Sequence, residues 1–136
     1  MEELARTLAG ERRALELLLF KLVEAQHLLA DGDDRFYAWA SAELDRVVEL
    51  VRDAELKRAL VLGGHGQTLA DVAASAPAPY GAILDDHRAS LRALLDEIER
   101  SRAASCELSR VDSDASQALT GATCGLALTS LADFLA

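Results

Sequence analysis

Residues 11–29, ERRALELLLFKLVEAQHLL, carry the densest apolar helical pattern in the chain. Steps of four and three residues alternate through this stretch, and the positions they reach, the first seam, are Leu4, Leu8, Glu11, Leu15, Leu18, Leu22, Ala25 and Leu29. Glu11 is the only polar residue in the first seam. This spacing places the side chains on one helical face and therefore predicts a helix. Leu17, Leu19, Phe20 and Val23 widen that face, so the helix is expected to contact at least two neighbours.

The composition of the 136-residue chain favours one all-α domain. A hydrophobic content of 51% excludes wholesale disorder, and an aromatic content of 4% is low for a β sandwich. The net charge of −9, without any basic run, argues against a nucleic-acid partner. No apolar run reaches the ~18 residues of a membrane span, and the Met-Glu-Glu start lacks the cationic beginning of a secretion signal. We therefore expect a cytoplasmic protein without membrane insertion.

A second seam predicts a helix over residues 34–62, which follows a first helix over residues 3–30. The second seam consists of Tyr37, Ala40, Leu44, Val47, Val51, Ala54, Arg58 and Val61. In the link between the helices, Gly32 can adopt the left-handed conformation and Asp33 or Asp34 can cap the second helix. So short a link predicts an antiparallel hairpin. We expect Phe36 and Trp39 to plug its closed end, with an exposed binding aromatic at Trp39 as the alternative.

The remaining chain predicts a turn, a short helix and a third long helix. Residues 63–66, GGHG, follow a helix rather than a strand, so they predict a turn and not a phosphate-binding loop. Thr68 and Asp71 have the spacing of a capping box, which starts a short helix through about Ser75. Prolines at 77 and 79 end that helix and precede the third long one. Its seam is Tyr80, Leu84, His87, Leu91, Leu94 and Ile98.

Residues that carry chemistry are scarce and dispersed. The three histidines, His27, His65 and His87, lie in separate segments without metal-ligand spacing, so no metal and no cofactor is expected. His87 lies in the third seam and is expected to be buried or half-buried. Cys106 and Cys124 form no CxxC motif and have no activating neighbour in sequence. We therefore expect no enzyme, and a thiol enzyme that uses one of these cysteines is the alternative.

Three stretches together resemble the FlgN family of flagellar export chaperones, in the actinobacterial form. They are ERRALELLLFKLVEAQHLLADGD, RFYAWASAELDRVVELVRDAELKRA and TLADVAASAPAPYGAILDDHRASLRALLDEIE, and the resemblance covers roughly residues 4–105. It implies a helical hairpin, a short helix and another long helix, without catalysis or cofactor. It also implies a cytoplasmic chaperone that binds hook-filament junction (hook-associated) proteins, FlgK-like and FlgL-like, and prevents their assembly before type III export. The export gate is a second candidate partner.

The C-terminal segment, residues 111–136, carries an apolar helical stripe. Cys124, Leu128, Leu131 and Leu135 share one face, and Phe134 lies beside them. In the family this region binds the client, so the resemblance implies that these five residues are the client-binding site. The alternative is that the stripe docks on the hairpin as another core helix.

The expected architecture is an elongated antiparallel helical hairpin plus a third long helix, in a coiled-coil-like bundle. Residues 1–110 are expected to form the FlgN-like bundle, and residues 111–136 the candidate client-binding segment. The bundle would bury apolar client surface by helix-in-groove packing or helix exchange. A structural or self-associating coiled-coil protein without a client is the alternative function.

Overall fold

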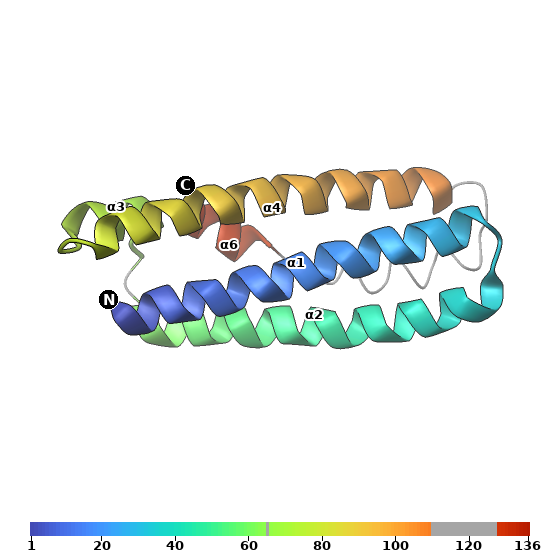
Figure 1. The fold of residues 1–136 in the computed structure, drawn as a ribbon, viewed down its shortest axis with the longest axis horizontal. Helices are drawn as coiled ribbons and strands as arrows, with labels where there is room; N and C mark the ends of the chain where they lie inside the picture. The colour runs from blue at the N-terminus through green and yellow to red at the C-terminus, as the bar shows by residue number, and fades with distance from the viewer. Residues whose placement is uncertain (65, 110–127) are drawn as a thin grey trace.

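The computed structural model describes residues 1–64, 66–109 and 128–136, with the backbone alone for residues 106–109. Its helices are α1 (Glu2–Ala30), α2 (Asp34–Leu62), α3 (Leu69–Ser75), α4 (Tyr80–Ser109) and α6 (Thr129–Leu135), and the described ranges contain no strand. Three long helices run side by side, with α1 packed against both α2 and α4 (Figure 1). The predicted all-α class, the hairpin and the third long helix are confirmed.

The link between α1 and α2 adopts the predicted chemistry. Gly32 has a φ of +69°, a conformation that a side chain would disfavour, and its N–H donates to the carbonyl of Leu29 at 3.2 Å. The Asp33 carboxylate accepts a hydrogen bond from the backbone N–H of Phe36 at 3.2 Å and so caps α2. The chain therefore reverses within three residues, which brings α1 and α2 together along their length.

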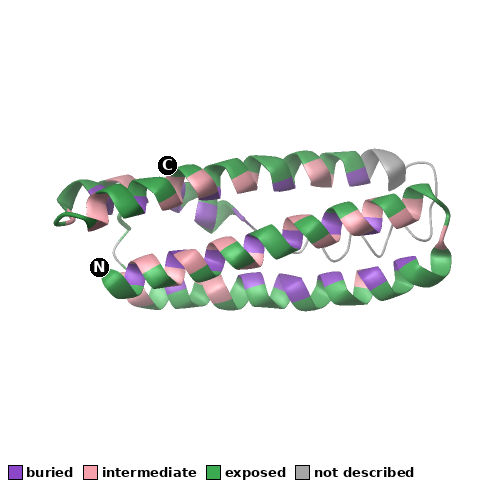
Figure 2. Cartoon of the chain, in the orientation of Figure 1, coloured by how far each residue is buried: buried purple, intermediate pink, exposed green. Residues whose placement is uncertain are grey.

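The core lies along the faces that the seams predict. Figure 2 shows the buried residues of α1, α2 and α4 turned toward the interior of the bundle. The members of the first and second seams that are buried are Leu4, Leu8, Glu11, Leu15, Leu18, Leu22, Ala25, Tyr37, Ala40, Leu44, Val47, Val51 and Arg58. Burial of these apolar faces, at roughly 25 cal/mol per Å², is the main term that stabilises helices of this length.

Replacing Leu18 with Ala should lower the free energy of unfolding by about 2–5 kcal/mol, because it leaves a cavity in the centre of the hairpin. The Leu18 side chain is only 1% exposed. Urea unfolding measures the loss. The matched control is Leu56→Ala on α2, where the side chain is 60% exposed and the expected change is within about 0.5 kcal/mol. Equal midpoints for the two variants would contradict the packing of α1.

The short helix α3 connects the hairpin to α4. Its capping box is complete: the Asp71 N–H donates to the Thr68 hydroxyl, and the Thr68 N–H donates to the Asp71 carboxylate, both at 3.2 Å. Helix α3 packs against α4. In α4, His87 is half-buried as predicted, and its burial lowers the pKa of the imidazole, as does the nearby Arg12.

The expectation that Phe36 and Trp39 plug the hairpin end is wrong. Trp39 is 68% exposed and Phe36 is 38% exposed, and their rings meet edge to face with centroids 5.9 Å apart. Tyr37 and Ala40 occupy the inward positions of this turn instead. A helix rotates ~100° per residue, so Phe36 and Trp39 fall on the flank of α2 once Tyr37 faces the core. Trp39 is exposed, as the alternative for this residue required, and a binding role for it stays a prediction.

Candidate functional site

The described part of the predicted client-binding stripe is buried within the chain itself. The exposed fractions of its side chains are 7% for Leu128, 2% for Leu131, 7% for Phe134 and 1% for Leu135. Cys124, its fifth residue, lies outside the described residues. Helix α6 packs against α4 and α3, so these four side chains belong to the core of the bundle. The segment is therefore docked, as in the alternative, but its helix packs on α4 and α3, whereas the alternative placed it on the hairpin.

A hydrogen-bonded cation holds the end of α6 on the bundle. Arg88 of α4 donates from Nε to the carbonyl of Leu135 at 3.2 Å and from Nη2 to that of Ala136 at 2.9 Å. The last carbonyls of a helix have no partner within it and carry a partial negative charge. Arg88 therefore satisfies the C-terminal end of α6, in addition to the apolar packing of its face.

The polar members of the first and second seams meet in the interior. Glu11 of α1 and Arg58 of α2 are 1% and 2% exposed, and Arg58 Nη1 donates to Glu11 Oε1 at 2.8 Å. In an antiparallel hairpin, residues near the start of one helix face residues near the end of the other. The sequence contained this signal, since each of the two residues is a charged member of an otherwise apolar seam, but the pairing was not predicted.

Arg58 also contacts α6. Its Nη2 donates to the Ser130 hydroxyl at 3.1 Å, and its guanidinium carbon lies 4.9 Å from the centre of the Phe134 ring, within cation–π range. Its second carboxylate neighbour, Glu55, lies 3.8 Å away. One side chain thus joins α1, α2 and α6, and the polar groups of Arg58 find partners although they are removed from water.

The charge of Glu11 is only partly compensated. Burial raises the pKa of Glu11 above its ordinary value of 4.5, the positive charge of Arg58 opposes this, and Glu55 adds to the rise. Among the described residues, Oε2 of Glu11 has no hydrogen-bond partner. Loss of either Glu11 or Arg58 would therefore leave the other charge in the interior without its partner.

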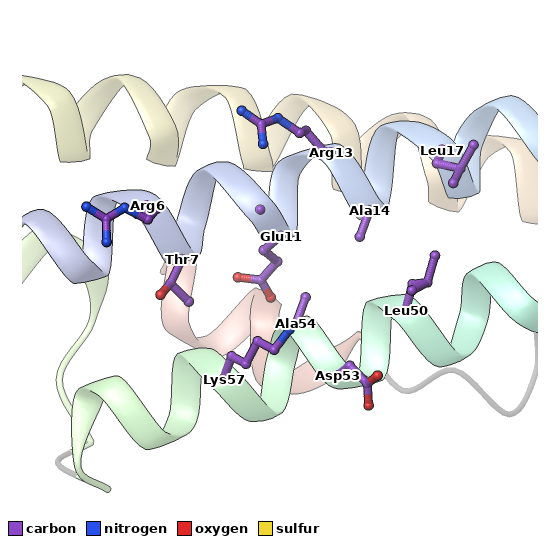
Figure 3. Close-up of a pocket in the computed structure, with 11 residues that line it drawn as sticks. Arg6, Thr7, Glu11, Arg13, Ala14, Leu17, Leu50, Asp53, Ala54 and Lys57 are labelled. Atoms are coloured by element: carbon purple, nitrogen blue, oxygen red, sulfur yellow. The ribbon is translucent and has the colours of Figure 1, made fainter.

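A groove of about 560 Å³ opens between α1 and α2 on the outer side of this pair (Figure 3). We call it the hairpin groove, and its lining residues are Arg6, Thr7, Gly10, Glu11, Arg13, Ala14, Leu17, Leu50, Asp53, Ala54 and Lys57. Leu17 and Leu50 are 38% and 51% exposed. One helical turn beyond Leu17, Lys21 bridges from α1 to Glu43 of α2. The hairpin groove thus combines a partly exposed apolar surface with charged residues at its edges.

Large apolar side chains are exposed elsewhere on the hairpin as well. Phe20 on α1 is 61% exposed, and Leu56 and Leu60 on α2 are 60% and 72% exposed. Exposed apolar residues that lie singly are common on protein surfaces, and these three residues add to the apolar surface of the hairpin outside the groove.

Within the described ranges, no three or more His, Cys, Asp and Glu side chains are grouped so that they could hold a metal ion. His65 and the side chain of Cys106 are outside what the structure describes. No described helix has the length and apolar character that crossing a membrane requires.

Comparison with known proteins gives no assignment for this chain. No family model, no curated protein and no solved structure matches it.

Proposed function

We propose that this chain is a cytoplasmic chaperone of flagellar type III export, which binds hook-filament junction proteins and prevents their premature assembly. The observation that carries the proposal is the helical hairpin whose groove exposes Leu17 and Leu50, a surface that can cover an apolar helical segment of a client. The resemblance to FlgN-like sequences supplies the class of client. Neither catalysis nor a cofactor enters this mechanism.

Two surfaces are candidates for the client, and their energetic costs differ. Use of the α6 stripe would require Leu128, Leu131, Phe134 and Leu135 to leave the core. Exposure of each such side chain costs roughly 1.5–3 kcal/mol, and the client contacts would have to return all of it before any affinity remained. The hairpin groove is already open to solvent, so a client can use it without unfolding part of the chaperone.

The purified chain should form a stable complex with a purified hook-filament junction protein from the same organism. Size-exclusion chromatography with light scattering measures the mass of the complex, and titration calorimetry measures its affinity. Flagellin serves as the matched control, because it is also exported but belongs to the filament and not to the junction. Equal binding of both proteins, or of neither, would contradict the proposed function.

The same exposed apolar surfaces also suit a second copy of the chain, as in a self-associating coiled-coil protein. Light scattering of the chain alone separates the two functions. A monomer that takes up a junction protein favours the chaperone, and a stable oligomer that ignores junction proteins favours the self-associating protein.

A further inference from the structure

The balance of charged residues in the hairpin groove differs from that of the whole chain. The protein carries a net charge of −9, yet three cations, Arg6, Arg13 and Lys57, line the groove. The anions that line it are Asp53 and the buried, paired Glu11. Figure 3 shows the cationic side chains coming from both α1 and α2. The residues that line the groove thus carry three cations against two anions, a net formal charge of +1 on a protein whose net charge is −9.

Two of these cations are not paired with any described residue of the chain. Arg6 forms an exposed ion pair with Glu2 at 2.7 Å. By contrast, neither Arg13 nor Lys57 has an ion pair or a side-chain hydrogen bond with any described residue. Both residues are exposed. Their charges are therefore available to an anionic partner, and both residues line the groove together with the apolar residues Ala14, Leu17 and Leu50. Figure 3 shows the Arg13 side chain extending from α1 away from α2, and the Lys57 side chain lying along α2.

Gly10 is a second, independent feature of the groove. It lies in the interior of α1, where glycine disfavours a helix by roughly 1 kcal/mol relative to alanine. Neither the packing nor the backbone conformation of the chain requires a glycine here. A Cβ at position 10 would meet nothing within 4 Å, and the φ of Gly10 is that of an ordinary helix. A glycine without an internal packing reason is suited to the close approach of another backbone.

We infer that the hairpin groove binds an acidic amphipathic helix of the client, with its apolar face on Leu17 and Leu50 and its carboxylates beside Arg13 and Lys57. This inference rests on the proposed function and specifies the chemistry of the bound segment. From Arg6 to Leu17 the groove wall rises ~17 Å, the length of about three helical turns. Gly10 lies within this wall, where the client backbone comes nearest to α1.

A leucine at position 10 tests the groove itself. Gly10→Leu places a side chain in the opening, and its Cβ meets nothing within 4 Å. The melting temperature should therefore stay the same or rise slightly, because leucine favours a helix more than glycine does, while affinity for the purified junction protein should fall at least ~tenfold. The matched control is Ala93→Leu, the same kind of change at an exposed position of α4 outside the groove. This control should bind as the unaltered chain does.

Charge reversal tests the acidic character of the client helix. The double variant Arg13→Glu/Lys57→Glu should weaken binding ~tenfold or more at low salt and less at high salt, because the lost attraction is screened. The control, Arg92→Glu/Arg100→Glu, makes the same change in net charge on exposed residues of α4. Synthetic peptides that cover the terminal segments of the junction protein, with and without Glu and Asp replaced by Gln, identify the segment.

The outcomes distinguish the inference from the proposed function. If the unaltered chain binds the junction protein and Gly10→Leu binds equally well, the groove inference is wrong and the chaperone stands. If Gly10→Leu weakens binding but neither charge reversal nor the Gln peptides do, the acidic character of the client helix is wrong. If the chain forms a dimer that Gly10→Leu dissociates, a second copy occupies the groove and the inference is overturned. Absence of any binding by the unaltered chain overturns both.

Discussion

Replacing Arg58 with Met should lower the free energy of unfolding by about 3–5 kcal/mol, because it leaves the buried carboxylate of Glu11 without its counterion. The same change removes the 3.1 Å hydrogen bond to Ser130 and the contact with the Phe134 ring, so α6 should loosen together with the hairpin. Denaturant unfolding measures the loss. Lys57→Met is the matched control, because Lys57 is exposed, and it should change stability by no more than about 0.5 kcal/mol.

The pH dependence of this variant gives an independent check of the cause. The folded-state pKa of Glu11 lies above its ordinary value of 4.5, so its neutral form stabilises the folded state at low pH, and this contribution is lost as the pH rises through the folded pKa. Removal of Arg58 removes an influence that lowers this pKa. The cost of Arg58→Met should therefore shrink as the pH falls from neutral toward 4.5.

A double variant separates the lost charge pair from lost packing. Glu11→Leu/Arg58→Met replaces the buried pair by apolar side chains, and it should recover most of the stability that Arg58→Met alone loses. A double variant as unstable as Arg58→Met would show that the interior depends on the shape of Arg58 and not on its compensation of Glu11.

The fold could be predicted from the sequence because each helix and each link depends on residues that are close together in the chain. The alternation of four and three places the seams on helical faces, Gly32 and Asp33 specify the link, and Thr68 with Asp71 specifies the start of α3. Each signal acts within a few residues and requires no knowledge of the rest of the chain. The bounds of the helices in the structure accordingly lie close to those predicted.

The candidate site was less accessible, because it depends on how elements meet. The hairpin groove needs the register that sets Gly10 and Arg13 of α1 against Leu50 and Lys57 of α2, and periodicity alone does not fix this register. The Glu11–Arg58 pair marks it, with charged residues at facing positions of the two seams. Phe36 and Trp39 are near the hairpin end in sequence, but neither belongs to the second seam, so their side chains are exposed and do not enter the core.

For the C-terminal segment as well, the sequence predicts which face is apolar but not which surface that face packs against. Periodicity identified the face of the C-terminal stripe, and Leu128, Leu131 and Leu135 do lie on one side of the described helix. An apolar face packs equally well on its own bundle or on a client, since burial has no directional preference. The choice between them comes from tertiary structure, which places α6 against α3 and α4.

The double variant Leu128→Ser/Leu131→Ser should lower the free energy of unfolding by roughly 4 kcal/mol or more in the absence of any client. Both side chains are buried, at 7% and 2% exposed, and the loss of each costs at least ~2 kcal/mol. Serine adds an unpaired hydroxyl to an apolar site. The loss in the free energy of unfolding cannot exceed the free energy with which α6 docks on the bundle, because a substitution in a helix that is already detached removes no further packing. Thermal and denaturant unfolding measure the change, with Thr129→Ser/Ala132→Ser on the exposed face of α6 as the control.

Affinity for the junction protein, measured below the melting transition of the variant, then decides the role of the tail. If the stripe is the client-binding site, loss of two interfacial leucines should weaken binding at least ~tenfold, since each contributes on the order of 1.5–3 kcal/mol by apolar burial. If it is core, the variant should melt early and still bind, because the residues of the hairpin groove lie on α1 and α2. Lost stability with intact affinity would remove Leu128 and Leu131 from the client-binding site and leave the chaperone function to the hairpin.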